Sequence, residues 1–178
     1  MSLATEVSAV QSVIGAGLTA QLDMRPIEPS DKPLLQDFLE RSSRESVYRR
    51  FLGPHGPFSD RELRHLTEVD HRDHEALVAV EPATGGGVGV ARYVRDRERR
   101  DSAEIAVVVN DAWQGHGVGS ALLFRLADRA RHEGITRLTA LMLTDNRSMA
   151  RLFAELGEPR VVSRDGGTVE LAVEISPA

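Results

Sequence analysis

The sequence predicts a mixed α/β domain, in which a mostly antiparallel sheet with one parallel pair of strands carries helices on its flanks. Three observations predict it. Apolar runs of strand length recur along the chain, a long amphipathic segment separates two of them, and glycine-containing turns lie between others. The chain has 178 residues, which suits one domain with its own hydrophobic core. We expect that domain over residues 21–178, after an N-terminal arm of unknown role at residues 1–20.

The sequence of residues 22–69 predicts an edge strand and three short helices. The strand contains Pro26, which an edge tolerates because not every N–H there must donate. Ser59 and Glu62 have the spacing of a capping box, which opens a helix. We expect the strand at residues 22–27 and the helices at residues 30–39, 43–51 and 59–69.

The rest of the domain predicts six strands and two helices. The first three strands follow one another through short turns and should pair antiparallel. The long helix ends at Gly134 and brings the next strand parallel to its predecessor by a right-handed crossover. We expect strands at residues 76–80, 88–94, 104–110, 138–143, 160–163 and 168–175, and helices at residues 118–132 and 146–156.

A glycine-rich loop joins the third of these strands to the long helix. Gly115, Gly117 and Gly119 allow positive φ, so successive N–H groups can turn toward one anion. Because the helix should begin near Gly117, its unpaired N–H groups and its positive dipole end point at the same place. The loop therefore predicts a phosphate or diphosphate site, to which Gln114 can add a side-chain contact.

Two common nucleotide-binding motifs do not fit this loop. A P-loop needs a lysine before Ser120, and the dinucleotide fingerprint needs two residues between its second and third glycines. The pattern Gln114-x-x-Gly117-x-Gly119 after an apolar strand instead resembles the signature of the GNAT superfamily of acetyl-CoA-dependent N-acetyltransferases. Taken alone, the motif leaves open an ordinary strand–turn–helix corner with tight packing.

The resemblance implies a GNAT fold with acetyl-CoA as co-substrate. Splaying of the strands at residues 104–110 and 138–143 would open a slot for the cofactor arm at their carboxyl ends. Arg147 and His116 could contact phosphates, or could simply be solvated. The residues that we expect to contact acetyl-CoA are Val107, Val108, Val109, Gln114, Gly115, His116, Gly117, Val118, Gly119, Ser120, Asn146 and Met149.

Glu104 is the one acid in an otherwise apolar central strand. Burial would raise its pKa and make it a usable base near neutral pH, directly or through water. Residues 103–105 also resemble the Ala-Glu-Ile segment whose glutamate is the general base in GNAT histone and protein lysine acetyltransferases, so we predict Glu104 as the catalytic base. The alternative is a structural ion pair with an arginine such as Arg92. A backbone N–H near Val107–Val109 is the expected oxyanion donor.

The last helix also resembles its GNAT counterpart, with one departure. Asn146, Leu152 and Gly157 match the pattern, but Phe153 occupies the position of a tyrosine that often protonates the leaving thiolate. A coenzyme A thiol has a pKa near that of free cysteine, about 8.5, so its thiolate can leave without a dedicated acid. Tyr93 is a candidate substitute, although a tyrosine in a strand usually serves packing.

Four segments together resemble the acetyltransferase domain of bacterial Pat-type protein lysine acetyltransferases, namely residues 48–51, 59–70, 90–93 and 103–120. Pat-type domains also lack the tyrosine, which fits Phe153. The resemblance, spanning roughly Leu22 to Gly157, implies lysine side chains of metabolic enzymes as acceptors, notably those of acyl-CoA synthetases. The alternatives are acetylation of a small amine, such as a polyamine, amino acid or antibiotic, and a non-catalytic acetyl-CoA-binding module.

Composition argues against several other classes of protein. The absence of cysteine excludes disulfides, thiolate metal sites and a cysteine nucleophile. A net charge of −5 argues against nucleic acid as the main partner. No apolar run approaches the length of a membrane span, and the N-terminus lacks the basic start of a signal peptide, so we expect no membrane association and a cytoplasmic location. A homodimer stays open.

Histidines and aspartates crowd the segment that precedes the first central strand. Their spacing fits no known metal motif, and a polar helix end beside a loop often collects such residues. The segment contains His65, Asp70, His71, Asp73 and His74. We therefore predict no metal site.

Overall fold

The computed structural model describes residues 21–175, so the expected arm at residues 1–20 lies outside the described residues. Each strand and helix predicted from residue 22 onward is present, with ends within two residues of those expected. Two short 3₁₀ turns were not predicted. The elements are β1 (Asp23–Pro26), η1 (Pro29–Asp31), α2 (Lys32–Arg41), α3 (Arg44–Phe51), α4 (Asp60–Thr67), β2 (His74–Glu81), β3 (Gly86–Arg95), β4 (Ser102–Val109), η2 (Asp111–Trp113), α5 (Val118–His132), β5 (Arg137–Leu143), α6 (Arg147–Ala154), β6 (Arg160–Asp165) and β7 (Thr168–Glu174).

The strands form one seven-stranded sheet in the order β1-β2-β3-β4-β5-β7-β6. Neighbours pair antiparallel except β4 and β5, which run parallel, as predicted. The parallel pairing covers only three residue pairs and ends where Glu104 meets Thr139. Beyond that point the two strands diverge, which confirms the expected splay and gives the sheet a fork.

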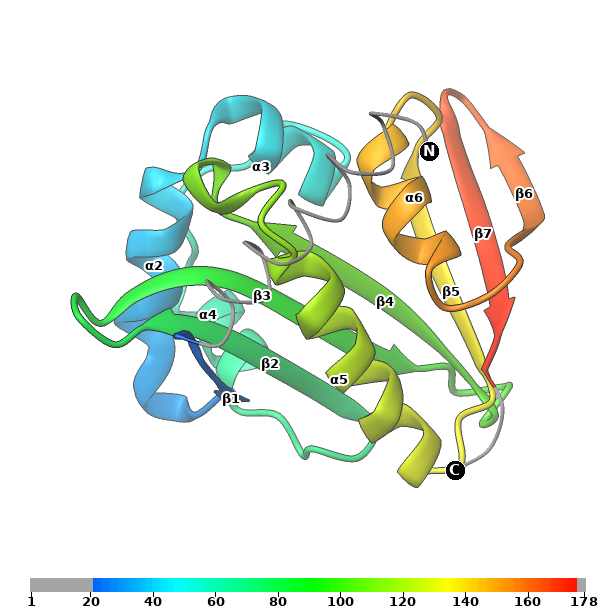
Figure 1. Cartoon of the computed structure of the whole chain (residues 1–178), viewed down its shortest axis with the longest axis horizontal. Helices are drawn as coiled ribbons and strands as arrows, with labels where there is room; N and C mark the ends of the chain where they lie inside the picture. The colour runs from blue at the N-terminus through cyan, green and yellow to red at the C-terminus, as the bar shows by residue number, and fades with distance from the viewer. Residues whose placement is uncertain (1–20, 176–178) are drawn as a thin grey trace, which may run out of the picture.

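Helices cover both faces of the sheet, and each face has its own core cluster (Figure 1). Helix α5 crosses one face over β2, β3 and β4, and α6 lies on that face beside β5 and β7 (Figure 1). Helices α2 and α4 pack on the other face, where Leu35 joins Val78 and Val90. Alternation of side chains along β2 and β3 supplies apolar groups to both clusters.

Packing holds α5 in place. Its buried residues include Leu122, Leu123 and Leu126, none of which has measurable exposure. Burying one leucine contributes roughly 2 kcal/mol, so these three outweigh a helix cap, which contributes about 1 kcal/mol. The amino-terminal end of α5 is therefore held rigidly against the sheet, beside the fork.

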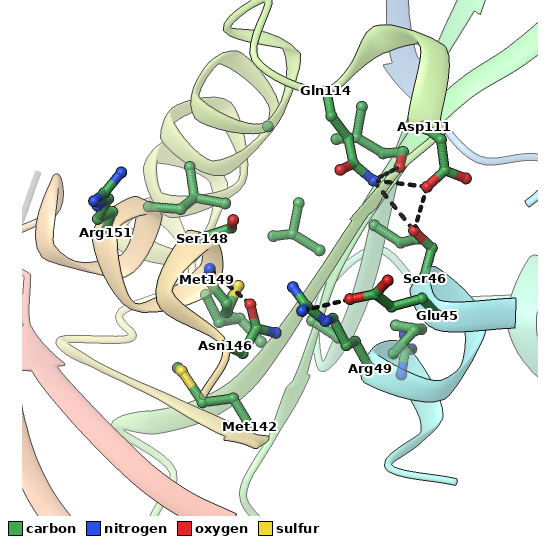
Figure 2. A pocket seen from close by; sticks show the side chains of 18 of the residues that line it. Glu45, Ser46, Arg49, Asp111, Gln114, Met142, Asn146, Ser148, Met149 and Arg151 are labelled. Carbon is green, nitrogen blue, oxygen red and sulfur yellow. Dashed lines mark hydrogen bonds and ion pairs between the residues drawn. The ribbon is translucent and has the colours of Figure 1, made fainter. Parts of the chain in front are cut away.

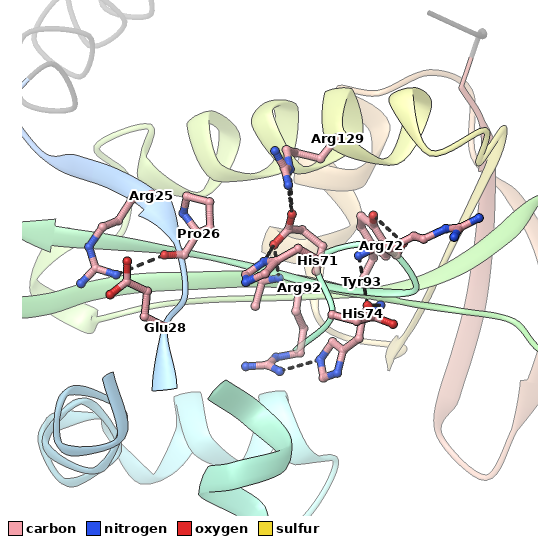
Figure 3. Close-up of polar contacts among 12 residues, drawn as sticks. Arg25, Pro26, Glu28, His71, Arg72, His74, Arg92, Tyr93 and Arg129 are labelled. Atoms are coloured by element: carbon pink, nitrogen blue, oxygen red, sulfur yellow. Dashed lines mark hydrogen bonds and ion pairs between the residues drawn. The ribbon is translucent and has the colours of Figure 1, made fainter. Parts of the chain in front are cut away.

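Two buried side chains, Glu75 and Tyr93, have their polar groups paired inside the fold (Figure 3). The Glu75 carboxylate has no exposure and pairs with Arg129 of α5 at 2.6 Å and with His71 at 2.7 Å. The Tyr93 hydroxyl donates to the Arg72 carbonyl at 3.0 Å. Burial, together with nearby carboxylates, raises the pKa of Tyr93. Tyr93 is thus a core residue, and the idea that it could replace the missing acid is wrong.

Candidate active site

A cleft of about 1090 Å³ opens at the fork between β4 and β5 (Figure 2). Strand β4 forms its floor, the glycine loop and the start of α5 form one wall, and α6 and α3 form the others. Figure 2 shows side chains from these elements converging on the cleft, among them Gln114, Asn146 and Met149. The predicted residues that line it are Glu104, Val107, Val108, Val109, Gln114, Gly115, Gly117, Gly119, Ser120, Asn146 and Met149.

The glycine loop presents a run of free backbone donors. The first backbone hydrogen bond of α5 is donated by Ala121 to the Gly117 carbonyl. Within the described part of the chain, none of the six N–H groups from Gly115 to Ser120 donates to a backbone carbonyl. Gly115 and Gly117 have φ of +76° and +80°, which only glycine adopts without strain. Six clustered donors at a helix start suit an anion such as a diphosphate.

Gly119 differs from the other two glycines, and the expectation of positive φ there is wrong. It lies inside the first turn of α5, so its backbone is helical. A Cβ at Gly119 would lie 3.4 Å from a Leu152 methyl and 3.6 Å from a Val109 methyl. Both distances are ordinary van der Waals contacts, so packing against α6 and β4 does not require glycine at this position.

Strand β4 leaves part of its backbone free where it passes the fork. Asn110 donates to Val88 and Asp96 donates to the carbonyl of Ser102, so the even-numbered residues of this strand face β3. By the alternation of a strand, the odd-numbered Val107 and Val109 direct their N–H and C=O groups toward β5, which has already diverged. The N–H groups of both residues are free to donate to an extended ligand arm or an oxyanion, and the Val107 carbonyl is free to accept from such an arm. The backbone of Val108 is turned toward β3.

Gln114 holds the end of β4. Its amide nitrogen donates to the Val109 carbonyl at 3.1 Å and to the Ser46 hydroxyl at 3.2 Å (Figure 2). The side chain thus links the strand, the loop and α3 while it lines the cleft. Its contact with a ligand stays a prediction.

Glu104 lies at the base of the fork and is exposed to the cleft. We expected it to be buried, and that expectation is wrong because β5 leaves β4 at this residue. The alternative ion pair with Arg92 is not formed either. Arg92 is buried, and its guanidinium contacts His74 Nε2 at 2.9 Å and donates to the Leu66 carbonyl at 3.2 Å (Figure 3).

The positive charge that interacts with Glu104 is the guanidinium of Arg50, in α3. Arg50 is half-buried and lines the cleft. Burial lowers the pKa of the Arg50 guanidinium, and the Glu104 carboxylate acts in the opposite direction. The site therefore holds the carboxylate of Glu104 and, beyond salt-bridge distance, the guanidinium of Arg50, on which the carboxylate acts electrostatically.

Comparison with known proteins decides the family. The sequence model of the acetyltransferase (GNAT) family matches residues 37–157, more than half of the chain. The chain belongs to the acetyltransferase (GNAT) family. The family is one of acetyltransferases, and acetyl-CoA is the co-substrate of this family.

Two proteins of related sequence and one solved structure show which members of this family the chain is similar to. The chain is 36% identical over 154 residues to Acetyltransferase Pat of Mycolicibacterium smegmatis, covering 86% of this chain and 46% of the relative. It is 30% identical over 162 residues to Acetyltransferase PA5475 of Pseudomonas aeruginosa, covering 86% and 87%. The GNAT domain of S. lividans PAT matches with a TM-score of 0.80 and 34% identity over 86% of this chain and 90% of that one. The chain thus spans about half the length of the mycobacterial relative.

Several features of the cleft suit acetyl-CoA, the co-substrate of the GNAT family. The free N–H groups of residues 115–120 suit its diphosphate, and the free edge of β4 suits its extended arm. The cleft volume, about 1090 Å³, is in the range of sites that hold large ligands. Which residues contact acetyl-CoA stays a prediction.

Three predicted phosphate or cofactor side chains do not line the cleft. Val118 is 1% exposed in the core, so only its N–H could reach a ligand. His116 turns its ring toward Trp113 at a centroid distance of 6.5 Å, and its Nδ1 is buried without a partner in the described structure. Arg151, one turn along α6, lines the cleft in place of Arg147.

Helix α3 supplies residues that the sequence analysis missed. Glu45, Ser46, Arg49 and Arg50 all line the cleft from this helix. Their spacing places them on neighbouring positions of one helix face. In the sequence such a polar face looks the same whether it borders solvent or a cleft, so only the position of α3 over the fork identifies it.

The histidine-rich segment holds no metal-like cluster. Among residues 21–175 no three His, Asp or Glu side chains lie together in a way that could hold a metal ion. Asp70 instead accepts from the N–H groups of Arg72, Asp73 and His74 at 2.8 to 3.0 Å. No helix in the same range is long and apolar enough to cross a bilayer.

Proposed function

We propose that this chain transfers the acetyl group of acetyl-CoA to lysine side chains of proteins, with Glu104 as general base. The observation that carries the proposal is the similarity to the Pat acetyltransferases, which extends over most of the chain. The segments singled out in the sequence point to the same Pat-type group. Acyl-CoA synthetases are the first acceptors to test, because the resemblance implies them.

Acetyl-CoA supplies an acetyl group already activated as a thioester. In this proposal the N–H groups of residues 115–120 hold the diphosphate, and the free edge of β4 holds the arm. The N–H groups of Val107 and Val109 are the candidate donors to the oxygen that becomes negative during attack. Fixed backbone donors of this kind typically contribute 10²–10³ in rate.

The acceptor amine must lose a proton before or during attack on the thioester carbonyl. Glu104 lies beside the fork and is open to solvent, so it can take this proton directly or through water. The amine nitrogen forms a bond to the carbonyl carbon, and the carbon–sulfur bond breaks. The electron pair leaves with the sulfur as a thiolate, which then takes a proton from water.

The absence of a tyrosine at Phe153 agrees with this scheme. Phe153 has no measurable exposure and packs in the core under α6, so it takes no part in proton transfer. With a thiol pKa of about 8.5 the thiolate is a tolerable leaving group. Leu141 lines the cleft and is 45% exposed, so the cleft is open to solvent on that side, where this proposal places the acceptor lysine.

The test is incubation of the purified protein with labelled acetyl-CoA and a cytosolic lysate, with Glu104→Gln as the inactive control. Labelled protein bands whose label maps to lysine support the proposal. Label found only in small molecules would favour a small-amine acetyltransferase and overturn it. Binding of acetyl-CoA without any transfer would overturn it in favour of a binding module.

A further inference from the structure

Asp111 is the first residue of the 3₁₀ turn η2, which leads into the glycine loop, and it is joined to the start of helix α3 through hydrogen bonds (Figure 2). Its carboxylate accepts from the N–H and the hydroxyl of Ser43, each at 2.9 Å, and from the hydroxyl of Ser46 at 2.8 Å. Gln114 adds a fourth bond, from its amide nitrogen to the Ser46 hydroxyl at 3.2 Å. Residues more than 60 positions apart in the sequence are thereby joined at one point.

These bonds are important because apolar packing holds α3 only in part, through the ring contacts of Phe51 with His55 and Phe58. Helix α3 has no buried residue, whereas α5 has six. A helix without fully buried side chains gains less from apolar packing, so its position depends more on polar contacts. Such a helix is among the less stable parts of a fold. Partial burial alone would raise the pKa of Asp111, but the bonds from Ser43 and Ser46 outweigh it and lower the pKa.

The two partners that Asp111 joins have different tasks. The loop that follows η2 holds the free N–H groups of residues 115–120. Helix α3 carries Arg49 and Arg50, which line the cleft on the side of Glu104. Because Asp111 joins these two elements, binding of a ligand in the loop can affect helix α3, which forms the wall of the cleft near Glu104.

We propose that Asp111 is a positioning residue that couples coenzyme A binding in the glycine loop to the ordering of helix α3. The proposal rests on the proposed function only in placing the cofactor in that loop. Coenzyme A that holds the loop also holds Asp111, and Asp111 then holds Ser43 and Ser46 at the start of α3. Because coupling of this kind is reciprocal, an ordered α3 also favours the loop conformation that binds coenzyme A.

Hydrogen–deuterium exchange of the whole chain, with and without coenzyme A, tests the proposal. In the wild type we expect coenzyme A to slow exchange in the loop at residues 115–120 and also in α3 at residues 44–51. In Asp111→Ala the slowing in the loop should persist and the slowing in α3 should be lost. Ser46→Ala removes the hydroxyl that bonds to both Asp111 and Gln114, so coenzyme A should slow exchange in α3 less than in the wild type. This second variant tests the coupling even if Asp111→Ala does not fold.

The matched control is Asp128→Ala, which removes an exposed carboxylate whose ion pair with Arg131 lies within α5. It should keep both effects of coenzyme A. Equal slowing of α3 in the wild type and Asp111→Ala would overturn the coupling, as would a wild type whose loop slows while α3 does not. No slowing in the loop of the wild type would overturn the cofactor site itself, and with it both proposals.

Discussion

Glu104 and Thr139 form the last residue pair of the parallel ladder between β4 and β5. The carboxylate therefore lies where the sheet divides, and the first free backbone groups of β4 follow within a few residues. At about 3.3 Å per residue, the N–H of Val107 lies roughly 10 Å further along the strand. One divergence of strands thus places a proton acceptor and an oxyanion donor along the same cleft.

Replacing Glu104 by glutamine should remove the proton acceptor and leave the cleft intact. General base catalysis typically contributes 10²–10⁴ in rate, so we expect kcat to fall by about that factor. The affinity for acetyl-CoA should not change, because Glu104 lies away from the glycine loop. Fluorescence of Trp113, the single tryptophan and a residue that lines the cleft, can measure that affinity. Near-normal turnover in this variant would remove Glu104 from the proposed reaction.

Alanine substitutions at Gly117 and Gly119 should distinguish a glycine that is needed for its backbone conformation from one that is not. Gly117→Ala places a side chain at φ +80° and should cost about 1–2 kcal/mol, together with a loss of acetyl-CoA affinity. Gly119→Ala places its Cβ in ordinary contact with Leu152 inside a helix, where alanine is favoured by about 1 kcal/mol. Thermal melting and acetyl-CoA titration of both variants check this. Equal losses in the two would contradict a special backbone at Gly117.

His74 should make the protein less stable in mild acid. Burial and then the adjacent Arg92 cation lower the pKa of His74 to about 4 from its ordinary 6.5. As the pH falls from 6.5 toward 4, the unfolded chain takes up a proton that the folded chain does not, so the free energy of unfolding decreases. The full effect would be about 3 kcal/mol, and partial exposure of the ring reduces it to about 1–2 kcal/mol.

Urea unfolding between pH 7.5 and pH 4 measures this loss of stability. His74→Gln should lose part of the decrease, because glutamine takes up no proton in either state. The control is His132→Gln on the exposed end of α5, which should keep the wild-type pH dependence. A His74→Gln profile parallel to that of the wild type would show that another group carries the effect.

Local patterns predicted most of the fold and the cofactor side of the cleft, because each depends on nearby residues. The capping box at Ser59 and the start of α5 at Gly117 are of this kind. The acceptor side depends on how distant elements meet. The exposure of Glu104 follows from where β5 diverges, and the charge beside it comes from Arg50, 54 positions earlier in the numbering. No local pattern contains either relationship.

Arg50→Met should stabilise the protein and impair its activity. Arg50 is half-buried, has no carboxylate within salt-bridge distance in the described structure, and lies near the buried cation of Arg92. Replacing a charge in such a place by an apolar side chain of similar length is often stabilising, here by about 1 kcal/mol, or roughly 2–4 °C in Tm. Turnover should fall, because Arg50 accompanies Glu104 in the cleft.

The adjacent arginine provides the matched comparison for stability. Arg49 is paired with Glu45 at 2.6 Å across one turn of α3, and it is 36% exposed. Arg49→Met should therefore give no gain in Tm and a loss of at most about 0.5 kcal/mol. Scanning calorimetry of the two variants decides the matter. A lower Tm in Arg50→Met would mean that stacking of its guanidinium on Phe51, at 5.0 Å from the ring centroid, outweighs the cost of burying its charge.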